Sequence, residues 1–398
     1  MNNSLNTNIS YFINNKTYNI KIINDVESME PYRNVWNSMA MHPHVDYEFY
    51  NMFVSSRSEV LNPLFILISS DNQVKAMMTG RVEEKYIEMK FGYKTILKQK
   101  ARLLNTIYKG FLGESNEIYM GIFVNNIIKF LQFNNVDLVS FDHIPVDSYI
   151  YQLAIKKPNL LSRDFIRRKE CHWSMTLPDT MDDFYNTRTK KSRHNLRNFI
   201  NRVNNNFNVT YRSFTDESNI DILLNDAEEV AKHTYQRGLG VGFDRSNEND
   251  NRIIFMAKSG WLRAYVLYLN DIPCSFAMGS LYKQTLYFNF IGYNPEYNKY
   301  ELGTIVFLKM VENLIVEKVK KIDFGFGDAY YKQRFGNKNE IESSICIFST
   351  SIKGVMINIS RTAIIGSSIL ANKMLEKMNI LNKIKKYWRK QVIPKSEL

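Results

Sequence analysis

The chain has 398 residues, which exceeds one typical domain and predicts two domains of about 150–180 residues each. A hydrophobic content of 44% and an aromatic content of 13% exclude a chain that is disordered throughout, and the net charge of +12 favours anionic partners. Three scattered cysteines exclude a disulfide framework and indicate a reducing compartment.

The first part of the chain predicts an α/β unit, which we assign to residues 1–164. Its clearest element is a hairpin of strands at 65–68 and 73–80, because the residues between them favour turns. The other expected elements are a strand at 18–23, a helix at 26–41, a strand at 86–91, a helix at 116–133 and a strand at 136–141.

The second predicted unit spans residues 165–350, and its clearest feature is an antiparallel meander of three strands. These strands are expected at 261–269, 274–282 and 285–293. A strand at 165–177, a helix at 181–204, a strand at 208–214 and helices at 220–236 and 248–258 precede them, and a helix at 305–316 and a strand at 322–324 follow. The glycine-rich loop 238–242 is compatible with a phosphate contact, a mobile loop or a plain turn.

Residues 320–336 carry the densest group of reactive side chains. The strand at 322–324 leads into Gly325 and Gly327, which permit a tight turn. Asp328 follows where a helix is expected to begin, and we predict that it caps this helix. The next turn brings together a phenol, an ammonium and a guanidinium group, from Tyr331, Lys332 and Arg334. Such a cluster suits anions or developing charge, although an amphipathic helix with ordinary surface charges explains the same pattern.

The pattern Asp-Phe-Gly-x-Gly-Asp-x-x-Tyr-Lys-x-x-Phe, from Asp323 to Phe335, resembles the closing signature of the cellulose-biosynthesis-type (CelD/BcsL-like) acyltransferases. These enzymes belong to the GNAT superfamily and are related to the Fem-type peptidoglycan aminoacyltransferases. The resemblance is strongest over residues 261–336 and is colinear over residues 30–260. It implies an α/β (α+β) fold of tandem GNAT-like domains with mixed, largely antiparallel sheets. The residue pattern separately predicts a basic amphipathic helix within residues 351–398.

The resemblance also implies where a donor would bind. In a GNAT domain the strands before and after the long helix splay apart, and acyl-CoA lies between them with its pyrophosphate at the helix N-terminus. Acetyl-CoA, or another acyl-CoA, would then be the co-substrate, and no metal is expected. The implied donor-binding residues are Phe288, Asn289, Phe290, Ile291 and Gly292 on the strand, with Gly303 and Thr304 at the pyrophosphate. Residues 299–304 are poorer in glycine than the usual loop, which leaves the identity of the donor open.

Direct acyl transfer needs a base for the nucleophile, positive groups for the oxyanion and a proton for the leaving thiolate. We assign Asp328 to orienting or deprotonating the acceptor, Lys332 to charge stabilisation and Tyr331 to proton donation. Asp323 is a reserve base, and Arg334 is a candidate phosphate ligand. Three further arginines are candidate phosphate or substrate ligands: Arg193 and Arg197 on the basic helix 181–204, and Arg237 before the glycine-rich loop. A solvated charged face explains the basic helix equally simply.

The resemblance implies an acceptor from cell-envelope or exopolysaccharide chemistry, such as an amino sugar on a nucleotide or lipid carrier, acylated at nitrogen or oxygen. Aminoacyl transfer from tRNA, with the basic helix on RNA phosphates, is the second reading. A non-catalytic membrane- or nucleic-acid-binding protein on a degenerate GNAT fold is the third.

The tail, residues 358–390, places Leu370, Met374 and Met378 on one helical face among lysines. This pattern fits a membrane interface, and it fits equally a last helix that packs on the domain. Residues 1–15 lack the basic start and the apolar run of a secretory signal. We therefore expect a cytoplasmic protein, peripheral on the inner face of the membrane.

Overall fold

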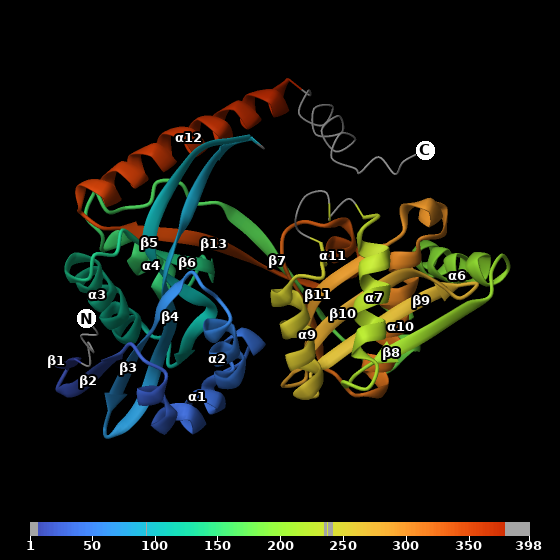
Figure 1. Cartoon of the computed structure of the whole chain (residues 1–398), viewed down its shortest axis with the longest axis horizontal. Coiled ribbons are helices and arrows are strands. Elements are labelled where there is room, and N and C mark those ends of the chain that lie inside the picture. The colour runs from blue at the N-terminus through green and yellow to red at the C-terminus, as the bar shows by residue number, and fades with distance from the viewer. Residues whose placement is uncertain (1–6, 93, 235–236, 238–241, 379–398) are drawn as a thin grey trace. The chain divides into compact units, whose positions relative to one another are not determined.

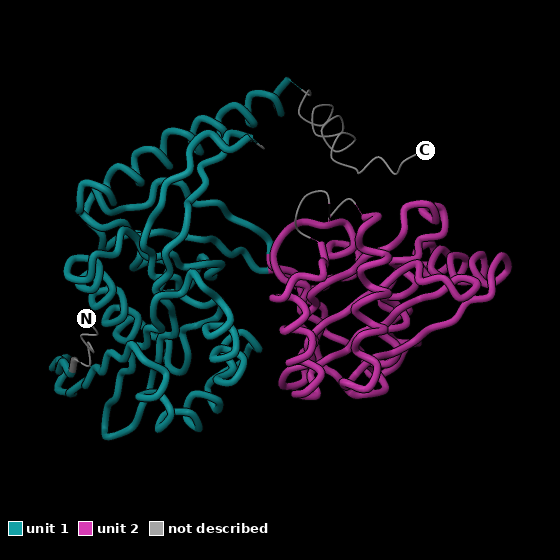
Figure 2. The backbone as a smooth tube through the Cα atoms, viewed as in Figure 1, with its two compact units in different colours: residues 1–171, 340–379 teal, residues 172–339, 380–398 magenta. Residues whose placement is uncertain are grey.

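The computed structural model describes residues 7–92, 94–234, 237 and 242–378. The chain divides into two compact units (Figure 2). Among the described residues, unit 1 holds 7–171 and 340–378, and unit 2 holds 172–339. The sequence expectation placed the boundaries at 164/165 and 350/351. The second boundary falls earlier in the structure because strand β13 (Lys338–Phe348) pairs with strand β6 (Leu138–Pro145) of unit 1.

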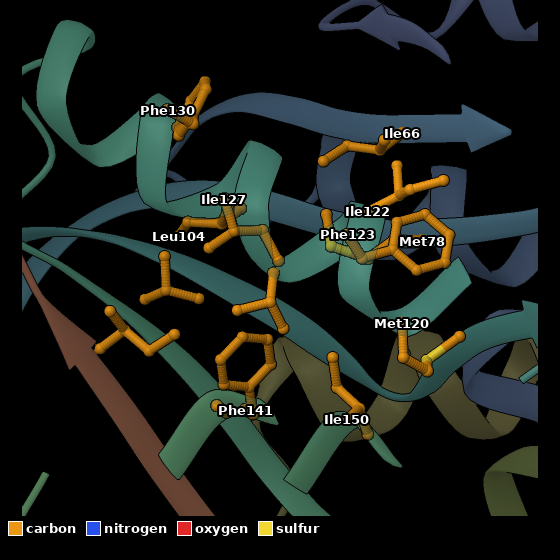
Figure 3. Packing of buried hydrophobic residues seen from close by; sticks show 14 of the residues in the cluster. Ile66, Met78, Leu104, Met120, Ile122, Phe123, Ile127, Phe130, Phe141 and Ile150 are labelled. Atoms are coloured by element: carbon orange, nitrogen blue, oxygen red, sulfur yellow. The ribbon is translucent and has the colours of Figure 1, made fainter. Parts of the chain in front are cut away.

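Unit 1 is built on a sheet in the order β1-β2-β3-β4-β5-β6-β13, in which only β5 and β6 are parallel. Its other strands are β1 (Thr7–Ile13), β2 (Lys16–Ile23), β3 (Val60–Ser70), β4 (Gln73–Phe91) and β5 (Lys94–Gly113). Its helices are η1 (Glu27–Tyr32), α1 (Arg33–Met39), η2 (Pro43–Val45), α2 (Tyr47–Ser55), α3 (Glu117–Phe133), α4 (Tyr149–Lys156) and α12 (Ile352–Lys377) (Figure 1). Helix α3 buries Phe123 and Ile127 against Met78, Leu104 and Phe141 of the sheet (Figure 3).

Unit 2 is built on a sheet in the order β7-β12-β11-β10-β9-β8, in which only β11 and β12 are parallel. Its strands are β7 (Lys169–Thr176), β8 (Val209–Phe214), β9 (Leu262–Leu269), β10 (Ile272–Tyr282), β11 (Thr285–Tyr293) and β12 (Lys321–Phe326). Its helices are α5 (Met181–Asn186), α6 (Lys190–Asn204), α7 (Ile220–Ala231), α9 (Asn247–Lys258), η3 (Pro295–Tyr300), α10 (Leu302–Val316) and α11 (Tyr330–Phe335). One apolar cluster joins the sheet to α5, α6 and α10, and another joins it to α7 and α9.

The two units repeat one arrangement, in which two antiparallel strands, a long helix and a parallel strand follow each other. In unit 1 these elements are β4, β5, α3 and β6, and in unit 2 they are β10, β11, α10 and β12. The predicted fold class, tandem GNAT-like units with mixed and mostly antiparallel sheets, is confirmed. The meander β9–β11 lies within two residues of its predicted bounds because its turns are tight. Asn270, Asp271, Lys283 and Gln284 all take positive φ there, as two-residue hairpin turns require.

Several predicted elements are different in the structure. The strand expected at 86–91 is the C-terminal end of the 19-residue strand β4. Its partner, strand β5, was not predicted. The helix expected at 26–41 is the short pair η1 and α1, because Pro31 lies inside it. The helix expected at 181–204 is interrupted between α5 and α6, where Thr189 accepts the N–H of Ser192 and starts a new helix.

Helix α12 replaces the first part of the helix expected at 358–390, and the rest of that prediction lies outside the described residues. By length and composition, α12 is the one helix among the described residues that is long and apolar enough to cross a membrane. The glycine-rich loop also lies outside the described residues except at Gly242.

Candidate functional site

Strands β11 and β12 pair only from Thr285–Lys321 to Tyr287–Asp323. Beyond this point β11 stays paired with β10 on its other side. Among the described residues no strand covers 288–292 on the β12 side, which leaves an extended backbone edge open to a ligand that pairs as an added strand. All five predicted donor-binding residues of this strand lie on that edge: Phe288, Asn289, Phe290, Ile291 and Gly292.

The open edge of β11 has an irregular and closely packed backbone. Asn289 is the extra residue of a β-bulge opposite β10, and its Oδ1 atom accepts a hydrogen bond of 2.9 Å from Ser280. A Cβ atom added at Gly292 would lie 2.5 Å from a ring carbon of Phe276. Glycine at this position therefore lets the ring pack against the strand.

Helix α10 begins beside this edge with an open N-terminus. Glu301 precedes it in the left-handed conformation, with φ 58°, and provides no side-chain cap. The N–H groups of Leu302 and Gly303 have no acceptor among the residues that the structure describes, whereas the N–H of Thr304 donates to Glu301 O. Free N–H groups and the helix dipole make such a terminus attractive to an anion.

Two arginines bring positive charge to this N-terminus. Arg334 places Nη1 3.4 Å from Thr304 Oγ1 and 3.9 Å from a carboxylate oxygen of Glu301. Arg188 and Arg334 both lie over the Phe335 ring, at 5.5 and 5.3 Å from its centroid. Burial, and next the charge of Arg334, lower the pKa of Arg188 to about 10. An anion held beside these two guanidinium groups would stabilise the charge of Arg188.

A buried histidine–carboxylate pair lies where the pairing of β11 and β12 ends. His172 Nε2 is 2.6 Å from Asp323 Oδ1, and both side chains are at least nine-tenths buried. Asp323 also accepts the N–H of Gly325 at 2.9 Å and lies 3.4 Å from Lys321 Nζ. Burial acts to raise the pKa of Asp323, but the hydrogen bond and charge of His172, together with Lys321, outweigh it and hold this pKa below its ordinary value.

His172 was not predicted as a site residue. Its partner is 151 residues away in the sequence, and the strand β7 that carries it becomes a neighbour of β12 only in the folded unit. The only local signal is a histidine inside a strand whose alternate residues are buried. That signal does not distinguish a functional histidine from a satisfied core histidine.

Asp328 does not cap helix α11, which corrects the prediction. Ala329 is the N-cap residue, and no side chain caps the helix. Asp328 is exposed and instead accepts a hydrogen bond of 3.0 Å from the indole N–H of Trp173. Lys332 donates to Phe326 O at 2.6 Å, which fastens α11 to the end of β12. Asp328 and Lys332 thus flank the glycine turn, each with a partner from unit 2.

Aromatic rings pack together in the core of unit 2 where β11 and β12 part. The ring of Tyr331 lies 5.9 Å from that of Phe288 on β11 and 6.1 Å from that of Phe324 on β12. Phe307 of α10 contacts both phenylalanines at 5.8 Å. The phenol predicted as a proton donor is therefore part of an aromatic wall.

The remaining predicted phosphate ligands are not brought to this opening. Arg193 donates to Asn186 Oδ1 at 3.2 Å, and Arg197 lies over the ring of Tyr185. Arg237 forms two hydrogen bonds with the Glu228 carboxylate, at 3.1 and 2.8 Å, and one with Phe243 O. Within the described part of the chain, no group of three or more His, Cys, Asp and Glu side chains is arranged to hold a metal ion.

Comparison with known proteins supports an acyltransferase fold for this unit. Residues 190–333 match the family model described as an acetyltransferase (GNAT) domain, and this match supports a transferase. No curated protein sequence matches the chain.

Solved structures with a similar fold include FemX, which has 12% identity, with a match that covers 79% of this chain and 98% of FemX and a TM-score of 0.49. A conserved protein of unknown function from Bacteroides thetaiotaomicron has 12% identity, covers 80% of this chain and 97% of its own, and has a TM-score of 0.48. L-PGS from Bacillus licheniformis has 13% identity, covers 73% of this chain and 86% of its own, and has a TM-score of 0.42. Likeness at this level says nothing about substrate.

Proposed function

We propose that unit 2 is an acyl-CoA-dependent N- or O-acetyltransferase that acts on a sugar precursor of the cell envelope or an exopolysaccharide. The observation that carries this proposal is the end of β11–β12 pairing at Tyr287 and Asp323, next to the open N-terminus of α10. The match of residues 190–333 to an acetyltransferase (GNAT) domain supports it. The acceptor class rests on the resemblance of residues 323–335 to the cellulose-biosynthesis-type acyltransferases.

In this proposal the donor extends along residues 288–292 of β11 and places its pyrophosphate at the N-terminus of α10. The N–H groups of Leu302 and Gly303 and the guanidinium of Arg334 would hold the phosphates, with Arg188 behind them. The thioester would then lie in the opening between the two strands, against the aromatic wall that includes Tyr331.

The transfer step forms a bond from the acceptor oxygen or nitrogen to the thioester carbonyl carbon and breaks the carbon–sulfur bond. His172 is oriented by Asp323 through the 2.6 Å contact, and we assign it the role of taking the acceptor proton. Burial acts to raise the pKa of Asp323, but His172 and Lys321 hold it below its ordinary value. Asp323 therefore acts as the carboxylate that orients His172 rather than as the reserve base. Asp328 and Lys332, on the rim, orient the acceptor, and a proton from Tyr331 or water neutralises the thiolate.

Calorimetric titration with acetyl-CoA, longer acyl-CoAs and free CoA tests the donor. We expect binding that a Gly303→Glu change weakens strongly, because a carboxylate at the start of α10 repels the pyrophosphate while remaining favourable for the helix. The Gly303→Gln variant has the same shape without the charge and serves as the matched control. Absence of binding to every CoA species would overturn the donor assignment.

The rim residues are tested separately from the donor. The double variant Asp328→Asn, Lys332→Ala should bind CoA normally and should transfer the acyl group slowly. Full activity of this variant would exclude both residues from the reaction.

Aminoacyl-tRNA is the second candidate donor, and one observation favours keeping it. Helix α6 carries Arg193 and Arg197, and no acid lies between Asp183 and Asp216. If RNA is the donor, Arg193→Gln and Arg197→Gln should weaken binding and reduce its salt dependence. If acyl-CoA is the donor, neither change should alter the affinity for CoA.

The chain itself is proposed to be cytoplasmic, since it works on a CoA thioester and the described residues contain no disulfide. We also propose contact with the inner face of the membrane. The described part of the helix predicted for this contact lies in α12, which belongs to unit 1.

A further inference from the structure

Helix α12 presents a continuous apolar stripe to solvent. Its large exposed side chains follow one another at three- and four-residue steps, or multiples of them: Ile352, Met356, Ile359, Leu370, Met374 and Met378, exposed by 83, 55, 63, 57, 58 and 63%. Ala363 and Ser367 occupy the two stripe positions between Ile359 and Leu370. The Ser367 hydroxyl donates to Ala363 O within the helix. No charged residue interrupts this stripe from Ile352 to Met374, and the exposed Lys377 joins it in the last turn of the helix. A soluble helix normally buries such a stripe.

The opposite face of α12 is bound to unit 1 by polar contacts. Arg361 Nη1 lies 2.6 Å from Asp164 Oδ1, and the Asp164 side chain is 1% exposed. The Asn358 side chain donates to the carbonyl groups of Leu161 and Arg163, and Ser368 accepts the N–H of Gly92. These contacts hold α12 along its length against the unit. The exposed stripe therefore lies along the surface of unit 1.

Two segments beside α12 add exposed apolar side chains and positive charge. The loop whose carbonyl groups receive Asn358 carries Leu160 and Phe165, exposed by 67 and 48%, and continues into the exposed run 167–169, Arg-Arg-Lys. The tip of the β4–β5 hairpin, which contacts Ser368 through Gly92, carries Phe91 and Ile96, exposed by 43 and 53%. The hairpin residues 83–100 hold five lysines and three glutamates, and these glutamates pair with four of the lysines, so among the described residues of this region the unpaired positive charge comes chiefly from the 167–169 run.

We propose that the α12 stripe, flanked by the 160–169 loop and the β4–β5 tip, docks on the surface of an anionic lipid bilayer. The apolar side chains would enter the boundary between head groups and acyl chains, and the flanking lysines and arginines would meet the lipid phosphates. The charge decides between a lipid surface and a second copy of the chain. Two such faces brought together would oppose positive rims, whereas an anionic bilayer complements them.

Flotation of the full chain with vesicles of phosphatidylglycerol mixed with phosphatidylcholine tests the proposal. We expect the chain to bind these vesicles, to release them at high salt and to bind pure phosphatidylcholine weakly. The double variant Ile359→Glu, Leu370→Glu should lose about tenfold or more in partitioning, because it places charge in the stripe. Both positions are exposed, so the fold should hold, and thermal unfolding checks this.

Two controls make the result specific to the stripe. Phe133→Glu changes a residue that is 81% exposed at the end of α3, and it should leave vesicle binding unchanged. Trp388→Glu changes the segment after the described residues, and it should have a smaller effect than the stripe variant. The proposal is overturned if the chain does not bind anionic vesicles, if the stripe variant binds as the wild type does, or if only Trp388→Glu abolishes binding.

Self-association is the remaining alternative for an apolar face. If the wild-type chain sediments as a dimer and the stripe variant as a monomer, with vesicle binding equal in both, the stripe is a subunit interface and the proposal fails. Every one of these measurements reads binding or mass, so their outcome is independent of acyl transfer.

Discussion

The Nε2 atom of His172 on β7 lies 2.6 Å from Oδ1 of Asp323 on β12, at the point where β12 parts from β11. If His172 takes the proton of the acceptor, its replacement by alanine should lower kcat by about 10²–10⁴-fold and leave the affinity for CoA unchanged. Steady-state kinetics with calorimetry measures both. His194→Ala changes an exposed histidine on α6 that bonds Asn198, and it should have normal kcat. A His172→Ala enzyme with normal kcat would exclude the assignment.

The same pair predicts how stability depends on pH. The pKa of Asp323 in the folded chain lies below its ordinary value of 3.8, because the pull of His172 and Lys321 exceeds the opposing effect of burial. The carboxylate therefore stabilises the fold at pH values above its unfolded pKa, and this stability is lost as the pH falls through the lower folded pKa. Urea unfolding of the wild type and Asp323→Asn should show a difference in unfolding free energy that narrows as the pH falls below about 4. A difference in unfolding free energy that widens below about pH 4 would contradict a lowered pKa of Asp323 in the folded chain.

The positive site at the start of α10 predicts an effect on donor affinity. Arg334→Gln removes a guanidinium that lies 3.4 Å from Thr304 Oγ1, and it should weaken CoA binding by about tenfold. Phosphate-free pantetheine should bind both forms equally, because it lacks the group that Arg334 holds. Loss of affinity for pantetheine would place Arg334 elsewhere on the ligand.

Two glycines near the donor edge should respond differently to alanine. Gly292→Ala places a Cβ 2.5 Å from the Phe276 ring and should reduce the free energy of unfolding by about 1–3 kcal/mol. Gly303→Ala places a Cβ 3.4 Å from Tyr293, an ordinary contact, and should leave stability within about 0.5 kcal/mol. Urea unfolding of both variants measures this difference, and equal stability of the two would contradict it.

The ion pair that holds α12 predicts a large effect on the stability of unit 1. Arg361→Met leaves the Asp164 carboxylate buried without its charge partner and should cost about 3–5 kcal/mol of unfolding free energy. Lys373→Met removes an exposed charge from the same helix and should cost less than about 0.5 kcal/mol. Chemical denaturation with a probe in unit 1 tests the pair, and near-equal costs would mean that the helix is held by other contacts.

Local sequence patterns were sufficient to predict the elements whose structure is specified by nearby residues. The meander β9–β11 was predicted closely because alternating residues and two-residue turns specify it within a short stretch of chain. Strand β5 was missed because its first half is rich in lysine, and its stability comes from pairing with β4 along most of its length.

The candidate site was predictable only in part. The glycine turn, Arg334 and Gly303 were found because each stands in a recognisable local context, and the structure brings Arg334 to the start of α10. The contacts of His172, Trp173 and Arg188 depend on residues far away in the chain. No sequence period reports such contacts. Asp328 was given a capping role because aspartate suits that position, yet the indole N–H of Trp173 competes successfully for its carboxylate.

Most of strand β13 follows the described part of unit 2 in the sequence, but the strand pairs with β6 of unit 1, and this affects the order in which the two units become complete during synthesis. Among the described residues, unit 2 is contiguous, from His172 to Asn339, and the two ends of this segment meet where Asn337 N–H donates to Ser174 O. All of these residues are in the nascent chain before most of β13 and the whole of α12 have been synthesised. Unit 1, although its first strand emerges earlier, must wait with β6 uncovered on one side until those last elements arrive. A premature stop near Asn339 would therefore leave all the described residues of unit 2 in place, although this unit is synthesised second. It would leave unit 1, which is begun first, without most of β13 and without α12.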